Sequence, residues 1–225
     1  MYQCELIDAA TLSQDLDWWA LYDASFPSCE REPRTAILDS IGTGRAIALR
    51  AVLHGATVGL GVAYLLKGMP FVFVAYLAVS DEARGHRLGA RLMDWMFAIG
   101  TLRLKRLGLE CRGLVLEAED PHLAVSDEAR AERLKRLGFF EKLGARVLPT
   151  PYVQPAIDGE SEVPLNLLVI DRDPRKPFAN LEGPELIRAM YFEKYAPVNG
   201  IDPPTLASLM NVSAPTLPQD SELAF

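Results

Sequence analysis

The sequence predicts an α/β protein built on a mixed β-sheet, and two observations support this class. Strand-like runs alternate with helical patterns along the first 170 residues, in the approximate order β-α-α-β-β-β-α-β-α-β-β. One run, Phe71–Val79, is apolar almost throughout, which is typical of a strand that is covered on both faces of its sheet.

The N-terminal segment is predicted to contain one strand and two helices. The strand is expected at Tyr2–Ile7. Thr11 and Gln14 have the spacing of a capping box, so a helix is expected to begin at Thr11. Phe26-Pro27 ends that helix, and a second helical pattern begins at Glu32-Pro33.

Three consecutive strands and a long helix are expected next. The strands are predicted at Ala46–Leu53, Thr57–Leu66 and Phe71–Val79. A glycine-containing turn, Arg84–Ala90, then leads into an amphipathic helix that ends near Leu107.

The C-terminal part repeats the alternation of strands and helices. We predict a strand at Leu114–Glu119, a helix from Ser126 that Gly138 ends, a strand at Leu165–Ile170 and a last helix at Glu185–Tyr195. The prolines of Pro149–Pro155 mark a loop.

An octamer, LAVSDEAR, occurs twice, at Leu77–Arg84 and at Leu123–Arg130. The first copy follows an apolar run and precedes glycines, so a strand and a turn are expected there. The second copy follows Pro121 and precedes helix-forming residues, so an N-capped helix is expected. The surroundings, rather than the octamer, are expected to decide its structure.

Length and composition favour one main domain. The chain has 225 residues, of which 49% are hydrophobic, and this suffices for one substantial core. We expect a core domain at residues 1–172, a C-terminal helical extension packed on it at 173–213, and a flexible tail at 214–225.

Charge and cysteine usage exclude several classes of function. The net charge is −7, which argues against a nucleic-acid partner and suits a cationic small molecule or a Lys-rich peptide. No window is apolar enough for a membrane span, and Met1–Ala10 lacks the basic start of a signal peptide. The three cysteines show no Cys-x-x-Cys spacing. We therefore expect a cytoplasmic protein without disulfides or a metal site.

The turn Arg84–Ala90 is the most informative motif. It is predicted to join a buried strand to a helix, and the free amides and dipole of a helix N-terminus favour an anion. Arg84, His86, Arg87 and Arg91 lie there without an intervening acid. This local excess of basic groups favours a ligand such as a pyrophosphate. An ordinary strand-to-helix turn with a solvated basic start remains the alternative.

The segment LAVSDEARGHRLGARLMDWMF, Leu77–Phe97, resembles the acetyl-CoA signature of the GNAT superfamily of N-acetyltransferases, which is a buried strand, R/Q-x-x-G-x-G/A and a helix. Arg84, Gly89 and Ala90 match. Arg87 replaces the middle glycine, and this replacement is tolerable if Arg87 is already in a helix-like conformation. LYDASFPSCEREP, LVLEAED and RLKRLGFFEKLGAR resemble further segments of the family, so the similarity spans about residues 1–170.

The resemblance implies a GNAT-type mixed, mostly antiparallel central sheet, with helices on both faces and a splayed pair formed by the strands at 71–79 and 114–119. It also implies transfer of an acetyl group from acetyl-CoA to a primary amine of a small molecule or peptide, by direct attack in a ternary complex. A backbone amide near Val79 would polarise the thioester carbonyl. The implied cofactor-binding residues are Leu77, Ala78 and Val79 for the pantetheine, and Arg84, Gly85, His86, Arg87, Leu88, Gly89 and Ala90 for the pyrophosphate.

Catalysis requires a group that deprotonates the acceptor amine, since its pKa is near 10. By the resemblance, Glu117 occupies the position of a base. Glu119, two residues further on, would face the same side of a strand and is the second candidate. In the alternative, both are surface acids on a solvated strand face and neither is the base. The family tyrosine that protonates the leaving thiolate is replaced by Phe140. Tyr152 is the substitute we consider, although the thiolate could also leave without an acid.

Two other functions remain open at this level. A catalytically silent acyl-CoA-binding sensor or regulatory protein is favoured by Phe140, which has no hydroxyl group. A GNAT fold that uses another acyl-CoA or an unusual acceptor is the other alternative. The sequence leaves a homodimer open.

Overall fold

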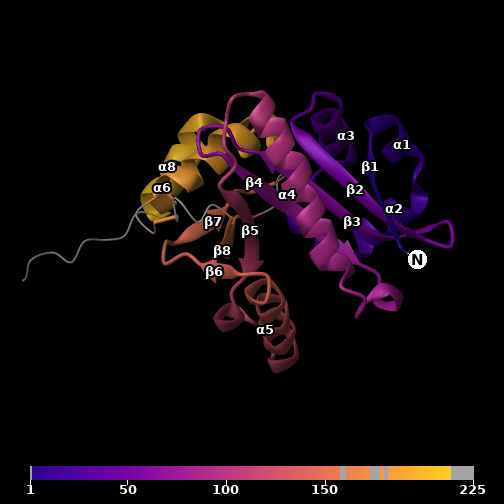
Figure 1. Ribbon diagram of the computed structural model, residues 1–225. Helices are drawn as coiled ribbons and strands as arrows, with labels where there is room; N and C mark the ends of the chain where they lie inside the picture. Colours follow the sequence, from indigo (N-terminus) through magenta and orange to yellow (C-terminus); the bar gives the residue numbers. More distant parts are fainter. Residues whose placement is uncertain (1, 158–160, 173–177, 180–181, 214–225) are drawn as a thin grey trace, which may run out of the picture.

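The computed structural model describes residues 2–157, 161–172, 178–179 and 182–213. Within them lies an eight-stranded sheet with the order β1-β2-β3-β4-β5-β8-β6, and β7 also pairs with β8 (Figure 1). The strands are β1 Gln3–Ile7, β2 Ala46–Leu53, β3 Ala56–Leu65, β4 Phe71–Val79, β5 Gly113–Glu119, β6 Ala145–Val147, β7 Tyr152–Gln154 and β8 Val163–Asp171. The β4/β5 pair is parallel and the other pairs are antiparallel, which confirms the predicted mixed, mostly antiparallel sheet.

Helices cover both faces of this sheet, as predicted (Figure 1). Buried side chains of the first helices and of α6 and α8 join one core cluster, whereas those of α4 and α5 join a second cluster on the opposite face. The helices are α1 Ala9–Gln14, α2 Leu16–Ser25, α3 Arg34–Gly42, α4 Leu88–Arg106, α5 Asp127–Glu141, α6 Gly183–Met190, α7 Ala196–Asn199 and α8 Pro203–Ser213. None of the described helices is long and apolar enough to cross a membrane.

The start of α1 differs from the prediction. The capping box at Thr11 and Gln14 is wrong, because Asp8 is the N-cap and accepts a hydrogen bond from the Thr11 backbone N–H at 2.8 Å. Aspartate is a strong N-cap residue, and the helix therefore begins at Ala9, two residues earlier than predicted.

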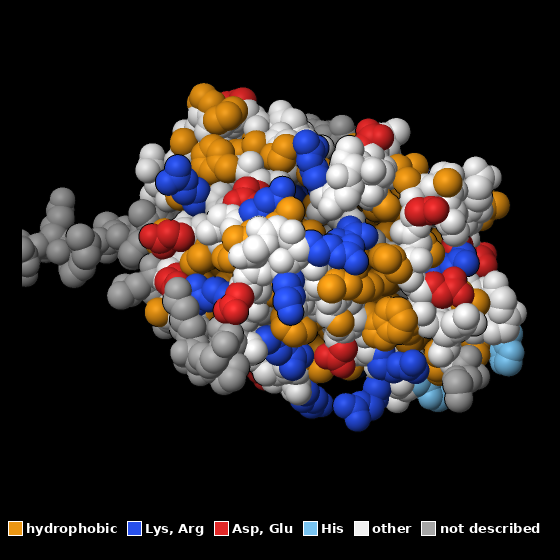
Figure 2. Space-filling model, turned by 45° about the horizontal axis from the view of Figure 1, so that its top comes forward, with side chains coloured by type: hydrophobic (Ala, Val, Ile, Leu, Met, Phe, Trp, Pro, Cys, Tyr) orange, Lys and Arg blue, Asp and Glu red, His pale blue; other side chains and the backbone are white. Residues whose placement is uncertain are grey.

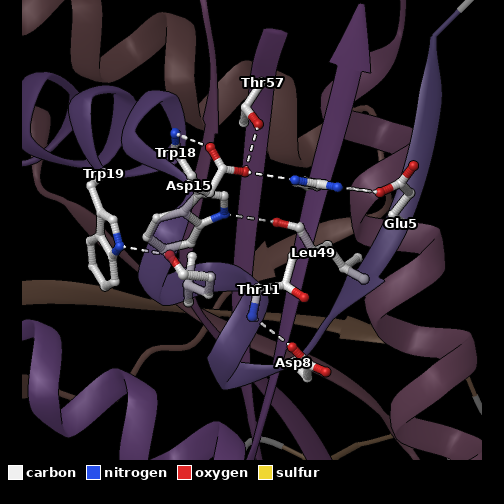
Figure 3. A network of polar contacts seen from close by, with 10 residues as sticks. Glu5, Asp8, Thr11, Asp15, Trp18, Trp19, Leu49 and Thr57 are labelled. Atoms are coloured by element: carbon white, nitrogen blue, oxygen red, sulfur yellow. Dashed lines mark hydrogen bonds and ion pairs between the residues drawn. The ribbon is translucent and has the colours of Figure 1, made fainter. Parts of the chain in front are cut away.

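Asp15 separates α1 from α2 and fixes both to the sheet (Figure 3). Its carboxylate caps α2 by accepting from the Trp18 backbone N–H at 2.9 Å. The same carboxylate binds Arg50 of β2 at 3.0 Å and Thr57 of β3 at 2.9 Å. These contacts set the position of the chain segment that follows α2, which reaches the functional site.

Three other boundaries differ from the sequence prediction. Helix α5 continues through Gly138 to Glu141, because a glycine costs only about 1 kcal/mol inside a helix. The predicted last helix is not the last, since α6 continues through a π-helical turn, Tyr191–Tyr195, into α7, and α8 follows. The predicted loop at the prolines contains the short strand β7.

The two octamers adopt the two structures predicted for them. The first ends β4 and forms a 3-10 turn at Asp81–Ala83, and in the second Ser126 caps α5. The division of the chain at residue 172 stays a prediction, although α6 and α8 share a core cluster with the sheet. The predicted tail, 214–225, lies outside the described residues.

Strands β4 and β5 separate in the second half of their length. Their parallel register runs from Phe71 opposite Gly113 to Val74 opposite Leu116, and then stops. Beyond it, β4 pairs with β3 as far as Val79, and β5 pairs with β8 as far as Glu119. The predicted splay is therefore present, and it exposes one edge of each strand to the opening between them.

Candidate active site

The opening between β4 and β5 leads to the turn that joins β4 to α4. The turn residues Arg84–Arg87 are exposed, and Gly85 has a φ of 85° with no atom within 4 Å of an added Cβ. Figure 2 shows Lys and Arg side chains gathered along the lower edge of one face beside a histidine. The turn thus offers free space and exposed basic residues to a phosphate group, although Arg84 also pairs with Asp81 at 2.7 Å.

Arg87 is the N-cap of α4 and has a φ of 57°, in the left-handed region. The expectation of a helix-like conformation for this residue is wrong. A left-handed conformation costs a non-glycine residue roughly 1–2 kcal/mol. This explains physically why a glycine suits the position that Arg87 occupies.

Gly89 allows α4 to approach α5. A Cβ atom at Gly89 would lie 3.1 Å from Cζ of Phe139. Phe139 in turn contacts Phe140, with ring centroids 5.1 Å apart, and Phe140 is buried in the core cluster of α4 and α5. A substitution at Gly89 would therefore disturb helix packing as well as the turn.

Glu117 is partly buried beside the opening and is held by three side chains. Its Oε1 accepts hydrogen bonds from the hydroxyls of Tyr152 and of Tyr195, the latter at 2.6 Å. Its Oε2 accepts from Nε2 of Gln154 at 3.2 Å. Burial raises the pKa of Glu117, while Lys194 and these donors counteract the rise. A carboxyl with a raised pKa is suited to accept and return a proton.

Tyr152 and Gln154 reach Glu117 from the same strand, β7, because residues two apart face one side of a strand. Burial, with the Glu117 carboxylate next, raises the pKa of Tyr152, so its hydroxyl stays protonated. The predicted pair of Glu117 and Tyr152 therefore lies together, although the two residues are 35 positions apart.

Glu119 has different partners. Its Oε1 lies 2.9 Å from Arg133 and its Oε2 lies 2.5 Å from Arg136, both on α5. Arg133 also donates to the Asp120 carbonyl at 2.8 Å. These contacts tie α5 to the end of β5, and they occupy both oxygens of Glu119.

Glu30 is a third carboxylate near the opening. It lies in a 3-10 turn after α2, and its backbone carbonyl accepts the Tyr76 hydroxyl of β4 at 2.8 Å. Burial, together with Glu119 and Glu117, raises the pKa of Glu30 to about 7, although Arg136 and Arg133 oppose the rise. Glu30 can therefore change its charge near neutral pH.

A buried ion pair lies next to this group. Nζ of Lys194 is 2.8 Å from Oε1 of Glu32, and both side chains are almost inaccessible. The other oxygen of Glu32 accepts the Tyr64 hydroxyl. The Lys194 ammonium also stacks 3.5 Å from the centre of the Tyr195 ring.

Two hollows flank this region of the described surface. One, of about 440 Å³, lies between the end of β5 and the start of α5. The other, of about 280 Å³, lies beside the segment that carries Glu30 and is lined by Tyr22, Asp23, Ser28, Arg31, Glu32, Pro33 and Arg34. The described residues contain no group of three potential metal ligands.

Sequence reasoning missed four residues of this cluster, namely Glu30, Gln154, Lys194 and Tyr195. The alternation in Tyr152–Gln154 is typical of a strand, and it would place Tyr152 and Gln154 on one face of that strand. The Tyr191 and Tyr195 spacing is typical of one helix face, but nothing local pointed that face toward Glu117.

The fold defined by the splayed pair, the turn and the flanking helices is that of the GNAT acetyltransferases. A protein from Bacteroides thetaiotaomicron assigned to this family superposes with a TM-score of 0.64 at 18% identity, over 89% of this chain and 99% of that one. Arabidopsis thaliana NAA60, solved with acetyl-CoA, has a TM-score of 0.55 at 13% identity, over 76% and 98% of the two chains.

Arabidopsis thaliana Naa50, solved with the bisubstrate analogue CoA-Ac-MVNAL, has a TM-score of 0.52 at 18% identity, over 79% of this chain and 99% of that one. No family model matches the sequence, and no curated protein sequence matches it either.

Proposed function

We propose that this protein transfers an acetyl group from acetyl-CoA to a primary amine of a small molecule or peptide, by direct attack in a ternary complex. The observation that carries the proposal is the opening between β4 and β5. The edge of Leu77–Val79 lies on one side of it, the partly buried Glu117 lies on the other, and the turn Arg84–Ala90 follows β4. Similar proteins that bind acetyl-CoA and a bisubstrate analogue support it.

The chain would bind the thioester through its backbone. Leu77, Ala78 and Val79 would hold the pantetheine, and the amides from Gly85 to Ala90 with Arg84 would hold the pyrophosphate. The amide near Val79 would stabilise the negative charge that develops on the carbonyl oxygen. Acetyl-CoA supplies the activated acyl group.

Glu117 is the proposed base. It would take a proton from the acceptor ammonium, so that the free amine can attack. Its raised pKa makes it a stronger base than an ordinary glutamate. Tyr152 already donates its hydroxyl to Glu117. It would pass that proton to the leaving sulfur and receive the proton held by Glu117. The ionised Glu117 would then accept the second proton, which the nitrogen loses as the amide forms, and release it to solvent. Glu119 is the weaker candidate, because Arg133 and Arg136 occupy its oxygens.

A thermal melt with acetyl-CoA is the first test. At about 100 times the dissociation constant, a ligand stabilises the folded state by roughly 2.7 kcal/mol. For a chain of this length, this corresponds to a rise of about 5–10 °C. Gly85→Asp should abolish the rise by placing a negative charge in the turn. Gly108→Asp is the matched control, because Gly108 has a similar φ of 76° and equally open surroundings, and it lies after the opposite end of α4.

Release of free thiol with a panel of amines tests turnover. A thermal rise with thiol release supports the acetyltransferase. A rise without release from any amine would favour the second candidate, a silent acyl-CoA sensor, for which the observation is Phe140. A larger rise with a longer acyl-CoA would favour a different acyl donor. The absence of any rise at millimolar concentration would refute both readings. A cytoplasmic location and a homodimer remain predictions.

A further inference from the structure

Lys194 is a buried lysine whose position requires an electrostatic explanation. Its side chain is 2% exposed and lies in the π-helical turn Tyr191–Tyr195. An ammonium group in a protein interior is costly unless it is paired. The wide π-helical turn directs two successive side chains, Lys194 and Tyr195, into the interior, and such turns occur frequently at functional sites.

Lys194 is linked to two carboxylates, the buried Glu32 and the partly buried Glu117. Its Nζ pairs with Glu32 at 2.8 Å. It also acts through space on Glu117, and Tyr195, whose ring covers the ammonium, donates to Glu117 at 2.6 Å. The ammonium is thus in direct contact with Glu32, and it lies against the side chain that donates to Glu117. The group carries a charge of −1 when Glu117 is ionised and is neutral when Glu117 is protonated.

We propose that Lys194 is a positioning residue for this site, and that its ammonium is the counter-charge that keeps the partly buried Glu117 carboxylate available as a proton acceptor. This inference rests on the proposed function and extends it to the C-terminal segment, which carries α6 to α8. Lys194 itself exchanges no proton with the substrate.

The groups that face Glu117 come from three elements besides its own strand. Strand β7 contributes Tyr152 and Gln154, which are neutral donors. The π-helical turn contributes Tyr195 and Lys194, and the 3-10 turn after α2 contributes Glu30. Of these groups, Lys194 is the one that carries a positive charge.

Two variants test this assignment through the position of the acid limb of the pH–rate profile. Glu32→Gln removes the competing carboxylate and leaves Lys194 to Glu117 alone, so the acid limb of the pH–rate profile should move to lower pH. The double variant Glu32→Gln/Lys194→Met removes the whole ion pair. Its acid limb should lie about 1 pH unit or more above that of Glu32→Gln. The rate at high pH should be largely retained in both.

A purely structural role would lower the rate at every pH and would leave the midpoint in place, and that result would overturn the proposal. If the double variant does not fold, Glu32→Gln alone can still refute the proposal. A midpoint that stays in place or rises in Glu32→Gln contradicts the proposed role of the ammonium.

Titration of the Glu117 carboxyl by carbon-13 NMR separates this inference from the proposed function. The resonance is assigned by its loss in Glu117→Gln, and the measurement needs no turnover. If the wild-type protein releases no thiol, the proposed function fails, but the titration still reports on Lys194. Equal midpoints for Glu117 in Glu32→Gln and in the double variant would refute the role of Lys194.

Discussion

Replacing Tyr195 with phenylalanine removes one hydroxyl that holds the Glu117 carboxylate and leaves the ring that packs on Lys194. A hydrogen bond to a charged group contributes about 1.5–3 kcal/mol. The loss should therefore raise the pKa of Glu117 further, and it should move the acid limb of the pH–rate profile up by about one pH unit or more. Tyr152 and Gln154 would still hold the carboxylate.

The sign of the stability change follows from this shift. Burial already raises the pKa of Glu117 above its unfolded value. Its favourable contribution to folding is therefore complete below the unfolded pKa and is lost as the pH rises through the folded pKa. Tyr195→Phe should destabilise the protein mainly at high pH, where Glu117 is ionised, and much less at low pH, where it is protonated.

The assay is thiol release against pH, together with denaturant unfolding at two pH values. Tyr191→Phe is the matched control, because Tyr191 is equally buried on the same turn but donates to the Val153 carbonyl, at 2.5 Å. The control should lose stability equally at both pH values and keep its pH–rate profile. A profile that moves equally in the two variants, or in neither, would refute the assignment of Glu117.

Three further outcomes are expected. Glu30→Gln should flatten the loss of wild-type stability between about pH 4.5 and 7, measured by urea midpoints, because the folded-state pKa of Glu30 is raised from 4.5 to about 7; an unchanged slope would contradict this. Gly113→Ala should destabilise by more than about 3 kcal/mol, since its Cβ would lie 2.1 Å from the Ile170 carbonyl oxygen, whereas Gly138→Ala, with open surroundings inside α5, should stabilise by up to about 1 kcal/mol. Arg87→Gly should raise the melting temperature by relieving its left-handed conformation, and a fall would argue against strain there.

The elements that the sequence predicts well are those whose signals are local. The apolar run Phe71–Val79 and the glycine turn after it specify a buried strand and a helix start without reference to the rest of the chain. Local signals compete at the boundaries, however. Asp8, and not Thr11, is the N-cap of α1, and α5 continues past Gly138 because the residues around that glycine favour a helix.

The polar site could be predicted only in part, because its members are brought together by tertiary structure. Glu117 could be selected because the strand that carries it resembles a segment of the GNAT family. Lys194 and Tyr195 are 77 and 78 positions away from it in the sequence, and their inward direction depends on a π-helical turn that no local pattern announces. The pKa of Glu30 depends on two carboxylates of β5. Such couplings are properties of the folded arrangement and not of any segment.

The position of the hydroxyl groups changes how Phe140 should be interpreted. Phe140 is buried in the core cluster on the α4 and α5 face of the sheet. The hydroxyls of Tyr152 and Tyr195 instead approach Glu117 from elements whose side chains pack on the opposite face. The loss of a hydroxyl at Phe140 therefore does not leave the centre without a proton donor. In the proposed mechanism Tyr152 gives its proton to the sulfur and is reprotonated by Glu117, with which it is hydrogen-bonded. The proton that Glu117 removed from the amine therefore replaces the one that the sulfur receives.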